Sequence, residues 1–399
     1  FEDRFGVSEE MVQQVLNAAL SKGGDFADLF LEYKTANRVV MEDDIIKESD
    51  EDITLGVGIR VLNGQQTGYG YTSDLSLEKM KQAALTAAAI AAAETRSKVG
   101  GLEAVAPDKQ VYQLKSSFAE ASLNDRIAMV KEAYAAAGAH DKRITKVVAM
   151  LTDELQYVTI ANSEGLLVSD ARPQSRIFVF ATAEEGETRV TGVGNAGGRV
   201  GTAFYRAAGS RPKDIGANAA KEAVLLLSAV NPVPGDQPVV LGSKNSGVVV
   251  HEAVGHPFEA DGVWRKTSIM WDKLGTEIAS PLVTIYDDAT IPQSRGSLNV
   301  DDEGTFTRKA MLVEKGKLVG YLYDRLSARL LGVESNGHGR RSSFRRMPIP
   351  RMNNTILARG DSEPEEIIKS VKKGFFAESY TGGMVQGTGK FTFSVNLGY

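Results

Sequence analysis

Two of the four histidines in this 399-residue chain, His251 and His256, lie within one six-residue stretch, and Glu252 directly follows the first. Neutral imidazoles are among the ligands that zinc takes in proteins. A carboxylate beside such an ion can accept a proton from a water molecule that the ion activates. Together these residues indicate a metal-dependent hydrolytic site on one short segment.

The separation of the two histidines differs from the familiar H-E-x-x-H pattern of zinc hydrolases. Residues four apart on an α-helix differ by about 40° in direction, whereas residues five apart differ by about 140°, which one ion could not bridge without distortion. A local i→i+5 turn, called a π-bulge, would bring both rings to one side. Gly255 tolerates such a deformation, and Pro257 disfavours a regular continuation. The alternative is two ordinary helix histidines, one buried and hydrogen-bonded and one exposed.

The segment before the histidines predicts a strand that leads into a helix. An apolar run at residues 238–241 is typical of a short strand, residues 242–247 are typical of a turn, and three valines at residues 248–250 lead into His251. The histidines would then lie on an apolar, packed element.

The segment from His251 to Asp261 closely resembles the metal-binding signature of the TldD/PmbA family, also called the modulator of DNA gyrase family, and of its TldD-type members in particular. The resemblance covers nearly the whole chain and is most specific in the second half. Further blocks that look like the family are residues 280–288, 295–297, 300–305, 320–325, 337–341 and 350–355, with looser matches at residues 27–29 and 56–62.

This resemblance implies a cytoplasmic zinc metallopeptidase that hydrolyses peptides or unfolded polypeptide segments. It implies that His251 and His256 are zinc ligands and that Glu252 is the general base. The family's third protein ligand is a cysteine in a more C-terminal segment, and these 399 residues contain no cysteine. We therefore expect that ligand to lie beyond Tyr399, in a longer chain of which residues 1–399 are a part.

Three residues are candidates to replace the cysteine if it is naturally absent: Glu259, Asp261 and His338. Catalytic zinc sites use three protein ligands and leave the fourth place to water. With only two protein ligands, zinc would bind weakly.

The resemblance also implies a homodimer, or a heterodimer with a PmbA/TldE-type paralogue that lacks the metal motif. The alternative function is a non-catalytic or regulatory peptide-binding subunit of such a complex. The net charge of −5 gives no reason to expect binding to nucleic acid or to anionic membranes. No apolar run reaches the roughly 18 residues that a membrane span needs. The lack of cysteine fits a reducing compartment.

Helical and strand-like patterns are mixed irregularly along the chain, which predicts an α+β fold with mixed sheets and packed helices. The Pro- and Gly-containing stretch at residues 231–235 predicts a boundary between an N-terminal α+β domain, residues 1–230, and a strand-rich C-terminal domain, residues 231–399, that carries the metal helix. The expected helices include residues 77–95 and 122–137, and the expected strands include residues 28–33, 38–42, 54–62, 145–151, 155–161 and 176–183.

Five arginines lie within twelve residues of the second half: Arg340, Arg341, Arg345, Arg346 and Arg351. Arginine offers a rigid fork of donors, so Arg340, Arg341 and Arg351 are candidates to bind the carbonyls or the C-terminal carboxylate of a peptide. The alternative is a solvated loop, or a structural tie to the acidic run at residues 301–303.

Overall fold

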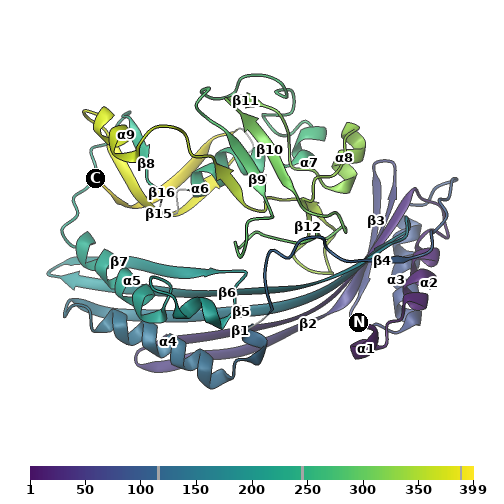
Figure 1. Cartoon of the computed structure of the whole chain (residues 1–399), viewed down its shortest axis with the longest axis horizontal. Coiled ribbons are helices and arrows are strands. Elements are labelled where there is room, and N and C mark those ends of the chain that lie inside the picture. Colours follow the sequence, from purple (N-terminus) through teal and green to yellow (C-terminus); the bar gives the residue numbers. More distant parts are fainter. Residues whose placement is uncertain (115–116, 244–246, 387–388) are drawn as a thin grey trace.

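The computed structural model describes residues 1–114, 117–243, 247–386 and 389–399. Its largest element is a seven-stranded sheet in the order β3-β2-β1-β5-β6-β4, with β7 also paired to β6 (Figure 1). In this sheet, the short pairing of β4 with β6 is the only parallel one among the described residues. The strands are β1 Phe26–Glu42, β2 Ile45–Asn63, β3 Gln66–Thr72, β4 Glu103–Val105, β5 Ile144–Asn162, β6 Leu166–Glu185 and β7 Thr188–Gly198.

The central strands are longer than the sequence patterns predicted. The runs expected at residues 28–33 and 38–42 are parts of β1, and those expected at residues 145–151 and 155–161 are parts of β5. β1 pairs with β2 on one side and with β5 on the other along almost its whole length. Because both edges are hydrogen-bonded, the polar residues between the apolar runs remain in the sheet.

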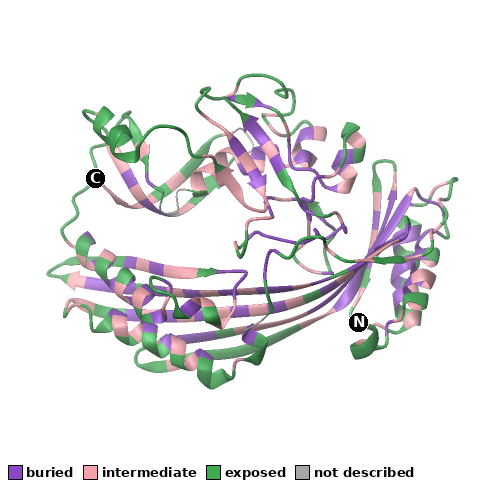
Figure 2. Ribbon diagram, viewed as in Figure 1, coloured by how far each residue is buried: buried purple, intermediate pink, exposed green. Residues whose placement is uncertain are grey.

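Four helices cover one face of this sheet (Figure 1). On β1, Leu29 and Leu31 belong to the core beneath one pair of helices, and Val39 and Met41 belong to the core beneath the other pair. Alternate residues of one strand therefore face all four helices. Figure 2 shows the resulting stripes of buried residues along the strands. The first pair is α2 Glu9–Ala19 and α3 Leu77–Ile90, and the second pair is α4 Leu123–Gly138 and α5 Pro212–Leu226.

The alanine-rich helix α3 lies against the backbone of β3. A Cβ atom on Gly68 would stand 2.0 Å from the carbonyl oxygen of Ala87, and one on Gly70 would stand 2.2 Å from that of Ala83. Only residues without large side chains allow this approach, which explains the composition of both elements. The helix ends at Ile90 rather than at the expected residue 95.

The chain after α5 lies on the opposite face of the large sheet (Figure 1). There Phe30 and Val158 of the sheet pack against Val300 and Phe344. Three smaller sheets complete the described fold. The first contains β8 Val239–Leu241, β15 Phe375–Val385 and β16 Phe391–Gly398, and the second contains β9 Ile285–Asp288, β10 Lys309–Glu314, β11 Lys317–Leu318 and β14 Thr355–Leu357. The third contains β12 Gly339–Arg340 and β13 Ile349–Pro350.

The remaining helices are short: α1 Glu2–Phe5, α6 Gly247–Val250, α7 Ala260–Trp264, α8 Arg325–Leu331 and α9 Pro364–Ser370. This mixture of helices with antiparallel and mixed sheets is the α+β fold that the sequence predicted. The division into domains at residues 1–230 and 231–399 stays a prediction. Within the described ranges, no helix is long and apolar enough to cross a membrane.

Buried ion pairs join the sheet to the second half of the chain. Arg60 on β2, only 1% exposed, pairs with Asp28 on β1 and, at 2.6 Å, with Glu303. Arg172 on β6 pairs with Asp302 at 2.5 Å. The acidic run at residues 301–303 therefore fixes the second half of the chain onto the sheet.

Replacing Arg60 by Met should lower the free energy of unfolding by about 3–5 kcal/mol, because it removes the cation of buried Glu303 and leaves buried Asp28 with Arg341 at 3.8 Å. Urea denaturation measures this loss. The control is Arg38→Ala, which breaks a pair with Glu48 in which the Arg38 side chain is 46% exposed, and it should cost no more than about 1 kcal/mol. Equal losses for both variants would contradict the role given to Arg60.

Candidate metal centre

The two histidines lie at the ends of a π turn. α6 runs directly into the π-helical segment η3 His251–Gly255, and the backbone N–H of His256 donates to the carbonyl oxygen of His251. This i→i+5 bond is the deformation that the five-residue separation predicted, so that prediction is confirmed. The strand expected at residues 238–241 is β8, and the turn expected at residues 242–247 lies partly outside the described residues.

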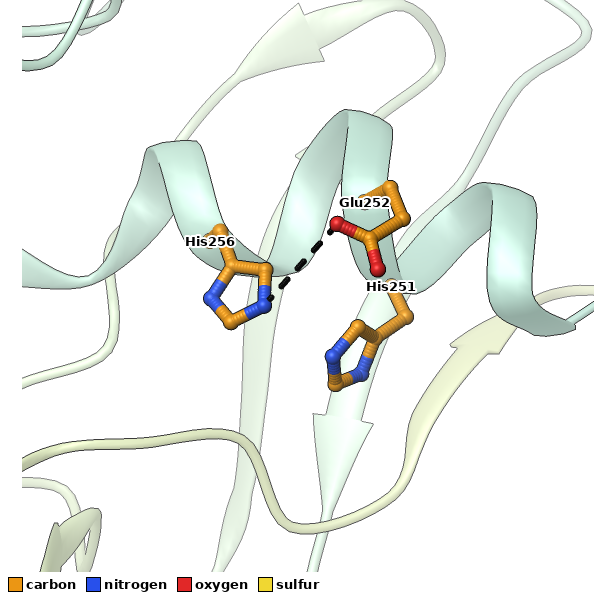
Figure 3. Close-up of side chains that lie close together, drawn as sticks. All are labelled: His251, Glu252 and His256. Carbon is orange, nitrogen blue, oxygen red and sulfur yellow. Dashed lines mark ion pairs between the residues drawn. The ribbon is translucent and has the colours of Figure 1, made fainter. Parts of the chain in front are cut away.

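The π turn brings both imidazoles to one side of the helix, next to Glu252 (Figure 3). The ring centroids are 4.6 Å apart and the ring planes are inclined by 85°. One potential ligand atom from each of His251, Glu252 and His256 lies within 4.8 Å of the others. Glu252 Oε2 stands 4.0 Å from His256 Nε2. Two imidazole nitrogens and a carboxylate oxygen, gathered in this way, are a donor set that fits zinc.

Gly255 is required for packing rather than for an unusual backbone conformation. Its φ of −53° is helical, so the tolerance expected from glycine is not what the turn uses. A Cβ atom at this position would stand 1.8 Å from Sδ of Met352. The π turn therefore rests directly on the buried Met352 side chain.

Glu259 orients the second histidine ring. Its Oε2 lies 3.3 Å from His256 Nδ1, and its Oε1 lies 3.3 Å from Nη1 of Arg351. A carboxylate on one ring nitrogen fixes the ring and leaves the other nitrogen, Nε2, to face the cluster. The i,i+3 spacing of His256 and Glu259 was a signal for this pairing that the sequence reasoning did not use.

Burial favours the neutral form of His251. Partial burial lowers the pKa of this imidazole below its ordinary value, and the neighbouring His256 lowers it further. Since a metal binds the neutral ring, the shift assists coordination at neutral pH.

The three substitute ligands expected from the sequence do not join the cluster in the described part of the chain. Glu259 is engaged with His256 and Arg351. Asp261 accepts from the backbone N–H of Gly262 and lies 3.6 Å from Arg265. His338 is fully buried, with its ring nitrogens 2.8 Å from Asn336 and 3.0 Å from Asp287. The structure therefore does not group these three residues with His251, Glu252 and His256, and their role as substitute ligands stays an untested prediction.

All five arginines of the basic segment line one cavity of about 950 Å³ together with His251. We call this space the histidine cavity; its wall also includes Tyr69, Ser342, Met352 and Asn353. Arg351 lies beside the group formed by His251, Glu252 and His256, because it pairs with Glu259, which contacts His256. Tyr69 comes from β3, far away in the sequence, and no local pattern could have placed it there.

Arg341 forms the structural tie that was the alternative for this segment. Its side chain is buried. Its backbone N–H donates to Asp302 Oδ2 at 2.8 Å, and its Nη2 donates to the Asp302 carbonyl oxygen at 2.7 Å. Arg340 donates from Nη1 to the Met352 carbonyl oxygen at 2.8 Å. Both residues are thus fixed in the wall of the histidine cavity.

Comparison with known families finds matches along most of the chain. Residues 27–91 match PmbA/TldA metallopeptidase domain 1, residues 116–227 match the central domain of that family, and residues 234–399 match its C-terminal domain. The metalloprotease TldD homolog of Haemophilus influenzae is 35% identical over 399 residues, which cover 98% of this chain and 83% of that protein.

Two solved structures share the fold. A modulator of DNA gyrase from Thermotoga maritima superimposes with a TM-score of 0.77 at 24% identity, covering 94% of this chain and 83% of that one. TldE from Thermococcus kodakarensis superimposes with a TM-score of 0.76 at 20% identity, covering 98% of this chain and 87% of that one.

Replacing Gly255 by Ala should lower the free energy of unfolding by about 1–3 kcal/mol, since the new methyl group overlaps Met352. Met352→Ala alone should cost about 2–5 kcal/mol. The double variant should lose less than the two single losses added together, because the truncated side chain no longer meets the methyl group. Chemical denaturation of all three variants measures this coupling.

Gly138→Ala is the control, since a Cβ atom there meets nothing within 4 Å and no loss is expected. Strictly additive losses for Gly255→Ala and Met352→Ala would show that this contact does not support the π turn.

Proposed function

The chain belongs to the PmbA/TldD family of metallopeptidases, and on that basis we propose that it is a zinc-dependent peptidase of peptides or unfolded polypeptide segments. The observation that carries the proposal is the π turn, which gathers His251, Glu252 and His256 within 4.8 Å. Two ordinary helix histidines would not need this turn.

His251 and His256 would hold the zinc ion, with Glu259 fixing the His256 ring from its other nitrogen. The family resemblance implies a cysteine as the third protein ligand, and that ligand stays a prediction. When bound, zinc would polarise the scissile carbonyl and lower the pKa of a water molecule.

Glu252 is the general base in this proposal. It is on the same turn as both histidines, with its carboxylate 4.0 Å from His256 Nε2, so it would lie close to a water molecule that the zinc ion activates. It accepts the proton of the attacking water and later donates it to the leaving amine. Glu252 thereby moves one proton from the nucleophile to the leaving group in each turnover.

The histidine cavity would hold the peptide. Its volume of about 950 Å³ lies near the upper end of the roughly 300–1,000 Å³ that is usual for ligand sites. Arg351 is half-exposed beside the metal cluster, and Arg340 and Arg341 are fixed in the wall. Guanidinium groups can donate to peptide carbonyls without a change in charge state, so these three arginines would position the chain.

A non-catalytic or regulatory peptide-binding subunit is the second candidate function. The observation in its favour is the close likeness of the fold to TldE. For either candidate we propose a cytoplasmic homodimer or a heterodimer with a PmbA/TldE-type paralogue. Metal-dependent cleavage by the full-length protein separates the two candidates, because only the peptidase loses an activity when a chelator is added.

Replacing Glu252 by Gln should lower kcat/KM for a fluorogenic peptide by at least about 100-fold, because the proton acceptor is lost. The zinc content, measured by elemental analysis, should stay unchanged. Glu365→Gln on the exposed helix α9 is the matched control and should cleave normally. A Glu252→Gln protein that keeps its turnover would exclude the proposed role.

Replacing His251 or His256 by Ala should each weaken zinc binding by about 100-fold or more, since even the loss of an orienting partner costs about 10- to 100-fold. Titration against a competing chelator measures this. His140→Ala, at an exposed position, controls for the loss of a histidine in general. Unchanged zinc affinity in either His251→Ala or His256→Ala would remove that residue from the site.

A further inference from the structure

A second cavity, of about 390 Å³, adjoins the histidine cavity. The two share Arg340, Arg341, Ser342 and Asn353 in their walls. The second cavity reaches toward the large sheet, where its wall includes Arg172 of β6 and Arg199, which follows β7. We call it the arginine pocket.

The carboxylates of the arginine pocket are already paired. Glu154 lies 3.8 Å from Lys34, and Asp302 lies 2.5 Å from Arg172. Arg199, Arg295 and Arg340 also line the pocket. Within the described ranges, none of these three arginines has a carboxylate within ion-pair distance. The pocket therefore carries positive charge that the described chain does not neutralise.

Arg199 is the clearest case. It is 5% exposed, and its Nε donates to the carbonyl oxygen of Ser297 at 2.9 Å. Its two terminal nitrogens donate to no group in the described part of the chain. Its guanidinium lies 5.7 Å from the centroid of the Tyr112 ring, a contact that compensates only part of the lost hydration. Burial lowers the pKa of this arginine to about 10.

Arg340, which lies where the two cavities meet, also lacks an ion pair among the described residues. Among the described residues, only its Nη1 has a hydrogen-bond acceptor, the Met352 carbonyl oxygen. Burial lowers the pKa of this partly buried side chain. Asp302 and Asp287 oppose the shift, whereas Arg172 and Arg351 add to it. A desolvated cation without an ion pair is costly, so a ligand that brings negative charge would stabilise both Arg199 and Arg340.

We propose that the arginine pocket binds a carboxylate of the peptide that the histidine cavity presents for cleavage, with Arg199, Arg295 and Arg340 as its donors. This inference rests on the proposed peptidase function and names its substrate class: peptides with a carboxylate in reach of the cleavage site. A planar carboxylate accepts two parallel hydrogen bonds from one guanidinium, which suits the free nitrogens of Arg199 and Arg340. The carboxylate is either the peptide's C-terminus or an aspartate or glutamate side chain.

The test measures binding without cleavage, in a Glu252→Gln background. Fluorescence anisotropy gives the Kd of three labelled versions of one short peptide: one with a free C-terminus and an internal glutamate, one amidated at the C-terminus, and one with glutamine in place of the glutamate. We expect one of the two changes to weaken binding about tenfold or more, because it removes a charged acceptor from a desolvated site.

The change that weakens binding identifies the source of the carboxylate, and either answer supports the proposal. Equal affinities for all three peptides would overturn it.

Arginine variants then test which residues bind the carboxylate of the peptide. Arg199→Gln and Arg340→Gln should each abolish most of the preference for the charged peptide, and Arg295→Gln, at an exposed position that tolerates substitution, should reduce it. Arg359→Gln is the control, since this residue lies outside both cavities with its side chain 81% exposed, and it should keep the full preference. A preference that survives in Arg295→Gln and in every folded variant at positions 199 and 340 would place the carboxylate elsewhere.

Failure of this proposal and failure of the peptidase proposal give different results. A protein that cleaves peptides without a carboxylate preference keeps the peptidase function and loses the arginine pocket. A protein that prefers the charged peptide but never cleaves it retains the pocket and becomes the peptide-binding subunit.

Discussion

The candidate site depends on one geometric constraint: two imidazoles five residues apart cannot face one ion from a regular α-helix. The π turn at His251–Gly255 removes this obstacle by shifting the hydrogen bond of His256 to His251. Such a turn inserts one residue into the helical pattern and persists only where the surrounding packing holds it. Here the packing is the contact between Gly255 and Met352. Met352, about a hundred positions later in the chain, therefore supports the turn that carries both histidines.

Buried ion pairs connect the wall of the histidine cavity to the large sheet. Arg60 and Arg172 extend from the large sheet to the acidic run at residues 301–303. Asp302 then accepts from the backbone of Arg341. The wall of the histidine cavity is thereby fixed to the sheet, and Tyr69 of β3 completes it by accepting from Arg341 Nη1 at 3.2 Å. The large sheet contributes none of His251, Glu252 and His256, but it shapes the space in which a substrate would lie.

What the sequence could predict was local in character. The five-residue separation of His251 and His256 was enough to predict the π turn, although the backbone tolerance expected of Gly255 is not used. The helix expected at residues 122–137 is α4, and it starts at a capping box between Ser122 and Asp125, three residues apart. In both cases the hydrogen-bonding groups come from neighbouring residues, so the spacing indicates the bond, although the packing of Met352 under the π turn does not follow from it.

What the sequence could not predict depends on contacts between distant segments. β1 continues through a polar interruption because β2 pairs with it on one side and β5, about a hundred residues later, pairs with it on the other. Arg199 gave no signal, since an isolated arginine is usually solvated, and only the folded chain shows that it is buried without an anion. The packing reason for Gly255 was also hidden, because Met352 reaches it from another element.

The most direct test of the account is anomalous X-ray scattering at the zinc edge from crystals of the zinc-loaded full-length protein. We expect one peak about 2.0–2.1 Å from a ring nitrogen of His251 and at the same distance from His256 Nε2, with the π turn intact. A zinc ion bound away from these rings, or histidines that point to opposite sides of a regular helix, would contradict it.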